Sequence, residues 1–297
     1  MKLTPQTRRE MMKSSAGLGL AGLSMGAGFL SCSSLWGKPS PPSGQRFKIG
    51  MCGWMLKEKT VPEEMEIAKR LGFDGIQLIM QESPDGCPLL KPEVRQKYLA
   101  TAKELKMGIA GVALGALSRI PYKSDPRAQQ WVADSITVSR ALRTRVVLVG
   151  FFGKAADLKN DPKGTEVVIQ RFKEIAPQAE KAGVVLGIES WLSADELMAI
   201  LDKVGSSAVQ VYYDMGNCHK MGYDIYKEIR FLGPHICEVH AKDYDGLFGK
   251  GTINFPEVRR AMDDIHYRGW MHIESGASEE DIGYNERYLR TIFPKNA

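Results

Sequence analysis

The chain has 297 residues, of which 43% are hydrophobic, 25% charged and 8% aromatic. This composition is typical of a globular protein and excludes a disordered chain, a collagen-like repeat and a small disulfide scaffold. The net charge is +5, but residues 1–45 hold five basic side chains against one acidic, so residues 46–297 carry only +1. Residues 46–297 are so close to neutral that they do not indicate the basic surface that nucleic-acid binding requires, and we expect no nucleic-acid partner.

Residues 1–45 are typical of an export signal followed by a linker. Arg8 and Arg9 precede an uncharged stretch rich in Gly, Ala, Leu and Ser, which is the build of a signal peptide. The paired arginines resemble the twin-arginine motif, and the run 16–30, with five glycines, is too short for a transmembrane anchor. We therefore expect twin-arginine export to the periplasm. A lipobox-like sequence ending at Cys32 leaves a lipid anchor, and with it membrane attachment, as an open alternative.

From residue 46 onward, short runs rich in Val, Ile, Gly and Phe alternate with longer runs of helical periodicity. We expect strands at residues 47–52, 74–79, 108–113, 145–150, 184–189, 208–214, 235–240 and 269–274. We expect helices near residues 62–71, 92–106, 125–142, 162–182, 193–204, 221–231, 255–267 and 279–293. Eight such units predict a single-domain (β/α)8 TIM barrel over residues 46–297. A doubly wound sheet would show fewer units and a glycine-rich turn after the first strand, which Gly50 and Gly53 do not form.

The last four predicted strands each end in a potential metal ligand, namely Glu189, Asp214, His240 and Glu274. The carboxyl ends of the strands form the active-site face of such a barrel, and unpaired carboxylates are costly there. Three carboxylates and one imidazole suit a hard divalent cation, with Mn²⁺ as first choice and Mg²⁺, Co²⁺ or Zn²⁺ as alternatives. A capping or salt-bridge role is the alternative for any single one. Inward parity also places Glu238 and His272 in the barrel wall, where we expect them to pair.

The five cysteines contain no C-x-x-C pair, so the sequence does not indicate a thiolate zinc site. Four of these cysteines lie in the body of the chain. We interpret them as small buried hydrophobic residues. Pairing of some of them in an oxidising compartment is the alternative.

Six segments carry a family resemblance: residues 71–78 (LGFDGIQL), 183–189 (GVVLGIE), 211–217 (VYYDMGN), 238–243 (EVHAKD), 249–255 (GKGTINF) and 273–274 (IE). Together they resemble the xylose isomerase-like barrel superfamily, and within it the sugar phosphate isomerase/epimerase branch. The resemblance implies the same four metal ligands that the strand ends predict. The chain departs from the family at Gln77, where a glutamate is common, and at Lys250 and Asn254, which replace two acidic residues. Asn217 replaces a histidine that some members carry, and the nearest histidine is His219.

The resemblance implies a metal-dependent sugar isomerase or epimerase that moves a proton α to a carbonyl through an enediolate. Glu189 and Glu274 would take and return the proton from opposite faces, while the cation polarises the carbonyl. Phosphorylated sugars are uncommon outside the cytoplasm, so export favours an unphosphorylated sugar as the small-molecule partner. Candidates for substrate contacts are Trp54, Trp191, Asn217, His219 and Lys242.

Other functions remain open on sequence grounds. The same carboxylates could drive β-elimination from a keto-sugar or a 3-keto-glycoside, which would make the protein a lyase or dehydratase. A non-catalytic sugar-binding module is a further alternative. A DNA-repair endonuclease of the same superfamily would need more histidines than the five present.

Overall fold

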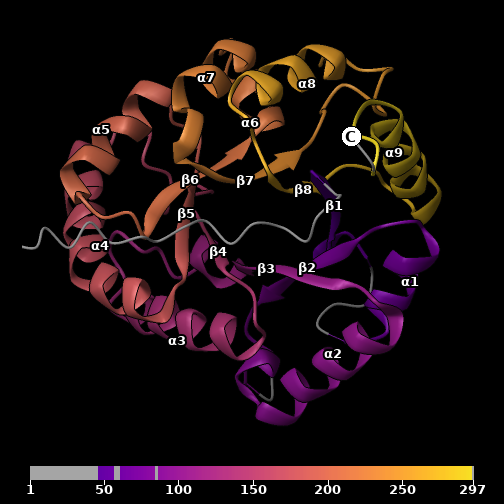
Figure 1. The fold of residues 1–297 in the computed structure, drawn as a ribbon. Helices are drawn as coiled ribbons and strands as arrows, with labels where there is room; N and C mark the ends of the chain where they lie inside the picture. The colour runs from indigo at the N-terminus through magenta and orange to yellow at the C-terminus, as the bar shows by residue number, and fades with distance from the viewer. Residues whose placement is uncertain (1–45, 57–60, 84–85, 296–297) are drawn as a thin grey trace, which may run out of the picture. The chain divides into compact units, whose positions relative to one another are not determined.

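The computed structural model describes residues 46–56, 61–83 and 86–295, so the predicted export signal and Cys32 lie outside the described residues. Eight parallel strands form one closed barrel in chain order, with helices around it (Figure 1). The barrel closes where the last strand pairs with the first, which sets Gly50 opposite His272. The predicted TIM barrel is therefore confirmed.

The strands, whose bounds agree closely with the prediction, are β1 (Phe47–Cys52), β2 (Gly75–Met80), β3 (Gly108–Leu114), β4 (Val146–Gly150), β5 (Val185–Glu189), β6 (Val209–Asp214), β7 (Ile236–Ala241) and β8 (Gly269–Ile273). The helices are α1 (Glu64–Arg70), α2 (Pro92–Leu105), α3 (Arg127–Ala141), α4 (Pro162–Ala182), α5 (Ala194–Val204), α6 (Met215–Lys220), α7 (Ile225–Leu232), α8 (Phe255–Asp264) and α9 (Glu279–Ile292).

The short helix α6 was not predicted, and it changes the start of the next helix. The Asp214 side chain accepts a hydrogen bond from the backbone N–H of Asn217 and so caps α6 immediately after β6. The expected helix over 221–231 consequently begins later, at α7, where Asp224 provides the cap. A predicted metal ligand therefore also starts a helix.

Helix α5 shows how capping residues and a buried apolar face determine the bounds and the packing of a helix outside the barrel. Ser193 and Glu196 form a capping box at its start, and Gly205 ends it in the left-handed region at φ +70°. Between them, Leu197 and Leu201 are buried on one face of the helix. The cap and the apolar face together hold α5 against the sheet beside the end of β5.

Strand alternation separates the outer core from the barrel interior. Leu186 and Ile188 belong to the large cluster between sheet and helices, whereas Val185 belongs to a small second cluster with inward-facing residues of β4 and β6. Among the described residues, the four cysteines are free, and no helix combines the length and apolarity needed to cross a membrane.

Candidate metal centre

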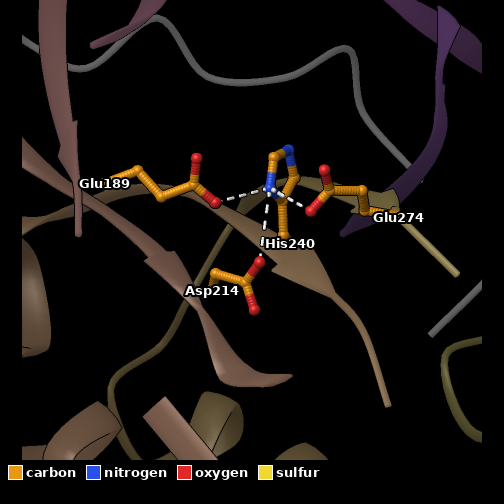
Figure 2. Close-up of side chains that lie close together, drawn as sticks. All are labelled: Glu189, Asp214, His240 and Glu274. Carbon is orange, nitrogen blue, oxygen red and sulfur yellow. Dashed lines mark hydrogen bonds and ion pairs between the residues drawn. The ribbon is translucent and has the colours of Figure 1, made fainter. Parts of the chain in front are cut away.

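The four predicted ligands meet inside the carboxyl end of the barrel. Each shares the inward parity of its strand: Glu189 follows Val185 on β5, and His240 and Asp214 lie opposite each other on β7 and β6. Glu274 comes one residue after β8. Figure 2 shows the three carboxylates directed at one nitrogen of the His240 ring. One ligand atom from each of the four residues lies within 4.8 Å of the others.

His240 Nδ1 is the centre of this cluster. It lies 2.8 Å from Glu189 Oε1, 3.4 Å from Glu274 Oε2 and 3.7 Å from Asp214 Oδ2. The side chains of His240 and Asp214 are each only 1% exposed, while that of Glu274 is 20% exposed and faces the open end. The site is therefore closed on the protein side and accessible at Glu274.

Asp214 provides the clearest test of whether a cation fits. Its Oδ1 accepts the Asn217 N–H at 2.7 Å, but its buried Oδ2 has no hydrogen-bond partner among the described residues. A buried carboxylate oxygen without a hydrogen bond is costly unless a cation approaches it. Because this oxygen faces the other three ligands, the residues present fit a bound divalent cation.

Two side chains hold Glu274 in place. Trp54 Nε1 donates to Glu274 Oε1 at 2.9 Å, and Lys242 Nζ donates to Glu274 Oε2 at 3.0 Å. Lys242 Nζ also lies 3.8 Å from Asp214 Oδ2. A Cβ added to Gly216 would lie only 2.7 Å from Lys242 Cβ, so the lysine stem needs a glycine there. Trp54 and Lys242 are thus directly joined to the ligand set.

Burial and charge set the protonation of the cluster without a cation. Burial raises the pKa of Glu189 to about 7; His240 opposes this shift, and Asp214 and Glu274 add to it. For His240, burial opposes the charge, but the contacts with Cys52, Glu189 and Glu274 outweigh it and raise the imidazole pKa well above its usual value. An imidazolium therefore balances part of the carboxylate charge, and a proton must leave when a cation binds.

The remaining predicted contact residues, Asn217, His219 and Trp191, differ in their contacts. Asn217 is buried, and its Oδ1 accepts the Tyr244 hydroxyl at 2.7 Å. His219 Nε2 lies 2.9 Å from Thr252 Oγ1, in the loop after β7. Trp191 packs edge-on against Phe152 with ring centroids 5.5 Å apart. Among the described residues, no hydrogen bond or ion pair joins His219 or Trp191 to the four ligands, and their substrate roles stay predictions.

The structure adds side-chain contacts at this centre that the sequence did not predict. Gln77 Oε1 lies 2.9 Å from His240 Nε2, and Cys52 Sγ lies 3.5 Å from the same nitrogen. Tyr244 places its ring centroid 4.9 Å from Lys242 Nζ. The inward parity of Gln77 on β2, together with its departure from the family's glutamate, was the available signal for it. Tyr244 carried no signal, because its position depends on the loop after β7.

The expected pairing of Glu238 with His272 is present only as a longer contact. Glu238 Oε2 lies 3.8 Å from His272 Nδ1, whereas the Tyr212 hydroxyl lies 2.6 Å from the same nitrogen. Burial raises the pKa of Glu238 and, with the nearby His240, lowers that of His272. Both shifts favour the uncharged forms, in agreement with the absence of a close ion pair between the two side chains.

Comparison with known proteins identifies sugar epimerases as relatives. The chain is 26% identical over 250 residues to L-ribulose-5-phosphate 3-epimerase UlaE of Escherichia coli (strain K12), covering 74% of this chain and 85% of that protein. The fold is shared with D-psicose 3-epimerase from Clostridium cellulolyticum H10 (TM-score 0.68, 19% identity, 83% and 99% covered). It is also shared with 3-keto-D-glucoside 4-epimerase, YcjR, from E. coli (TM-score 0.69, 14% identity, 82% and 99% covered).

These relatives are epimerases, which are isomerases in the broad sense, in agreement with the enzyme class that the sequence predicts. The family model described as xylose isomerase-like TIM barrel matches residues 65–292, nearly the whole barrel. The chain therefore belongs to the xylose isomerase-like TIM barrel family.

Proposed function

We propose that the protein is a metal-dependent sugar epimerase or isomerase that acts on an unphosphorylated sugar, with Mn²⁺ as its metal. The observation that carries this proposal is the convergence of three carboxylates on His240 Nδ1, with the four ligand atoms within 4.8 Å of one another. Glu189 and Glu274 approach that nitrogen from opposite sides in Figure 2. The family membership and the epimerase relatives support the same reaction class.

Two carboxylates on opposite sides of a substrate are what epimerisation needs. A divalent cation in this site would polarise the sugar carbonyl and so acidify the neighbouring C–H group. Glu189, whose pKa burial raises to about 7, can gain or lose a proton near neutral pH. Glu274 is oriented by Trp54 and Lys242, and it can transfer a proton at the opposite face of the substrate. Return of the proton to the same carbon gives the epimer, and return to the neighbouring carbon gives the aldose or ketose isomer.

The charge around the site supports a neutral sugar. Among the described residues, Lys242 is the basic side chain that is ion-paired with the metal ligands, and Glu274 and Asp214 already balance its charge. A phosphate group would bind best to a basic side chain whose charge is not already balanced, and Lys242 does not provide one. Trp54 can contribute an aromatic surface, and Asn217, Tyr244 and Lys242 can contribute polar contacts to sugar hydroxyls.

We also propose twin-arginine export to the periplasm, supported by Arg8, Arg9 and the uncharged run that follows them. This route exports folded proteins, so the site would be loaded with Mn²⁺ before it meets Zn²⁺ and Cu²⁺, which bind more tightly. Cell fractionation of the full chain and of its Arg8→Lys/Arg9→Lys variant tests this, because the variant should remain in the cytoplasm. Acyl labelling that depends on Cys32 would establish a lipid anchor.

The reaction itself can be tested by incubating the Mn²⁺-loaded protein with free ketoses, aldoses and 3-keto-glycosides and identifying the products by NMR. An epimer or an aldose–ketose pair, absent with the Glu189→Gln variant, is the expected result. Release of water or of an aglycone would instead identify a lyase that uses the same enolate. No product with any sugar, despite stoichiometric metal, would contradict the proposal and favour a sugar-binding module.

A further inference from the structure

The second ring nitrogen of His240, Nε2, contacts side chains outside the set of four ligands. Nε2 lies on the side of the ring opposite the three carboxylates and is 2.9 Å from Gln77 Oε1. Gln77 is fully buried on β2, 163 residues away along the chain. Cys52 Sγ is the other neighbour, 3.5 Å from Nε2 and 3.6 Å from Gln77 Oε1.

The Gln77 amide has a second polar neighbour, Glu238. Gln77 Nε2 and Glu238 Oε2 are both buried without a hydrogen-bond partner among the described residues. A Cβ on Gly111 would lie 3.2 Å from Glu238 Oε2 and 3.7 Å from Gln77 Nε2, so both atoms border the same small space. The structure places the amide oxygen 2.9 Å from His240 Nε2, which leaves the amide nitrogen on the side of Glu238. An amide nitrogen can only donate, and a carboxyl group, charged or uncharged, offers an oxygen that accepts.

The amide oxygen decides which nitrogen of His240 can bind a metal. An amide oxygen carries no proton, so the 2.9 Å contact requires the proton to sit on His240 Nε2. A neutral imidazole with its proton on Nε2 has its free lone pair on Nδ1, the nitrogen that faces Glu189, Asp214 and Glu274. A reversed amide would place the proton on Nδ1 and remove the imidazole from the ligand set.

We propose that Gln77 is a positioning residue that holds His240 in the Nε2–H tautomer and thereby presents Nδ1 to the metal. Such outer contacts fix the ring orientation of ligating histidines. An amide does this without adding a fourth negative charge to Glu189, Asp214 and Glu274. The inference rests on the metal centre of the proposed function, and it is tested by metal binding without any sugar.

Three variants separate a positioning role from a merely structural one. Gln77→Met keeps the length of the side chain but removes the acceptor, whereas Gln77→Glu keeps an acceptor. Ser135→Ala is the control, because Ser135 is equally buried and, among the described residues, its hydroxyl bonds only to the Val132 carbonyl within α3. Free Mn²⁺ is measured by electron paramagnetic resonance during titration at fixed pH. We expect Gln77→Met to weaken binding about 10–100-fold, Gln77→Glu to restore it, and Ser135→Ala to leave it unchanged.

Nitrogen NMR of the histidine rings provides a second readout that stability alone would not change. With Mg²⁺ as a diamagnetic probe, the wild-type His240 signal, assigned with a His240→Asn variant, should show a protonated Nε2 and an unprotonated Nδ1. Wild-type Mn²⁺ affinity in Gln77→Met, or a His240 ring protonated on Nδ1 in the loaded protein, would overturn the inference. If Gln77 controls Mn²⁺ affinity but no sugar reacts, the proposed function fails while this inference stands.

Discussion

Lys242→Met tests how the charges of the metal centre are balanced. The substitution keeps the length of the side chain but removes the ammonium group that lies 3.0 Å from Glu274 Oε2 and 3.8 Å from Asp214 Oδ2. Without a metal ion in the site, His240 is then the one positive partner that the carboxylates of the cluster keep among the residues that the structure describes. We expect the metal-free protein to lose stability, whereas the protein with bound Mn²⁺ should lose little, since the metal replaces the lost charge.

The size of this effect follows from the contact. A hydrogen bond between charged groups contributes about 1.5–3 kcal/mol, and the Lys242 side chain is only 20% exposed, so solvent screens it weakly. In a protein of this size, 1 kcal/mol shifts the melting temperature by about 2–4 °C. The metal-free variant should therefore melt about 3–12 °C below the wild type. Saturating Mn²⁺ should raise the melting temperature of the variant more than that of the wild type.

Scanning calorimetry with and without Mn²⁺ measures both quantities. Lys203→Met is the matched control, because its ion pair with Glu166 spans 3.2 Å but both side chains are at least 60% exposed. Exposed pairs contribute little, so this control should melt within about 2 °C of the wild type in both conditions. An unchanged melting temperature for metal-free Lys242→Met, or an equal Mn²⁺-induced rise in both proteins, would refute the charge-balance reasoning.

Two further predictions concern the same cluster. The pKa of His240 is raised well above its usual value and that of Glu189 to about 7, so both groups lose competing protons as pH rises, and the apparent metal affinity should rise with pH. Calorimetric titration in two buffers of different ionisation enthalpy should show proton release, and its absence would contradict these shifts. Gly216→Ala should destabilise the fold by about 1–3 kcal/mol in urea unfolding, because the new Cβ would lie 2.7 Å from Lys242 Cβ; wild-type stability would show that Lys242 can move freely.

Periodicity was sufficient to predict the barrel and the direction of its inward side chains. Strand alternation alone places Glu189, Asp214 and His240 toward the barrel axis, and the eight-unit count predicts that their strand ends meet. Small differences at the strand ends did not matter: β7 runs one residue past His240, and β8 stops one residue before Glu274. Each side chain keeps its inward direction across such a shift.

Contacts across the barrel could not be predicted in the same way. The hydrogen bond between Gln77 and His240 depends on the register of two strands that are not neighbours in the sheet. The position of Tyr244 depends on a loop without periodicity, and its contact with Asn217 exists only because α6 follows β6 directly. The sequence carries residue types and spacing, whereas these contacts require distances that only the closed barrel defines.

Deuterium incorporation from solvent tests the central claim most directly. The Mn²⁺-loaded protein is incubated in D₂O with each sugar, and the mass of the recovered sugar is measured. We predict deuterium on the carbon next to the carbonyl, lost on chelation of the metal and lowered about 10²–10⁴-fold in Glu189→Gln and in Glu274→Gln. Exchange that persists at the wild-type rate in both variants, or that does not depend on the metal, would contradict the assignment of these two carboxylates as the proton-transferring groups.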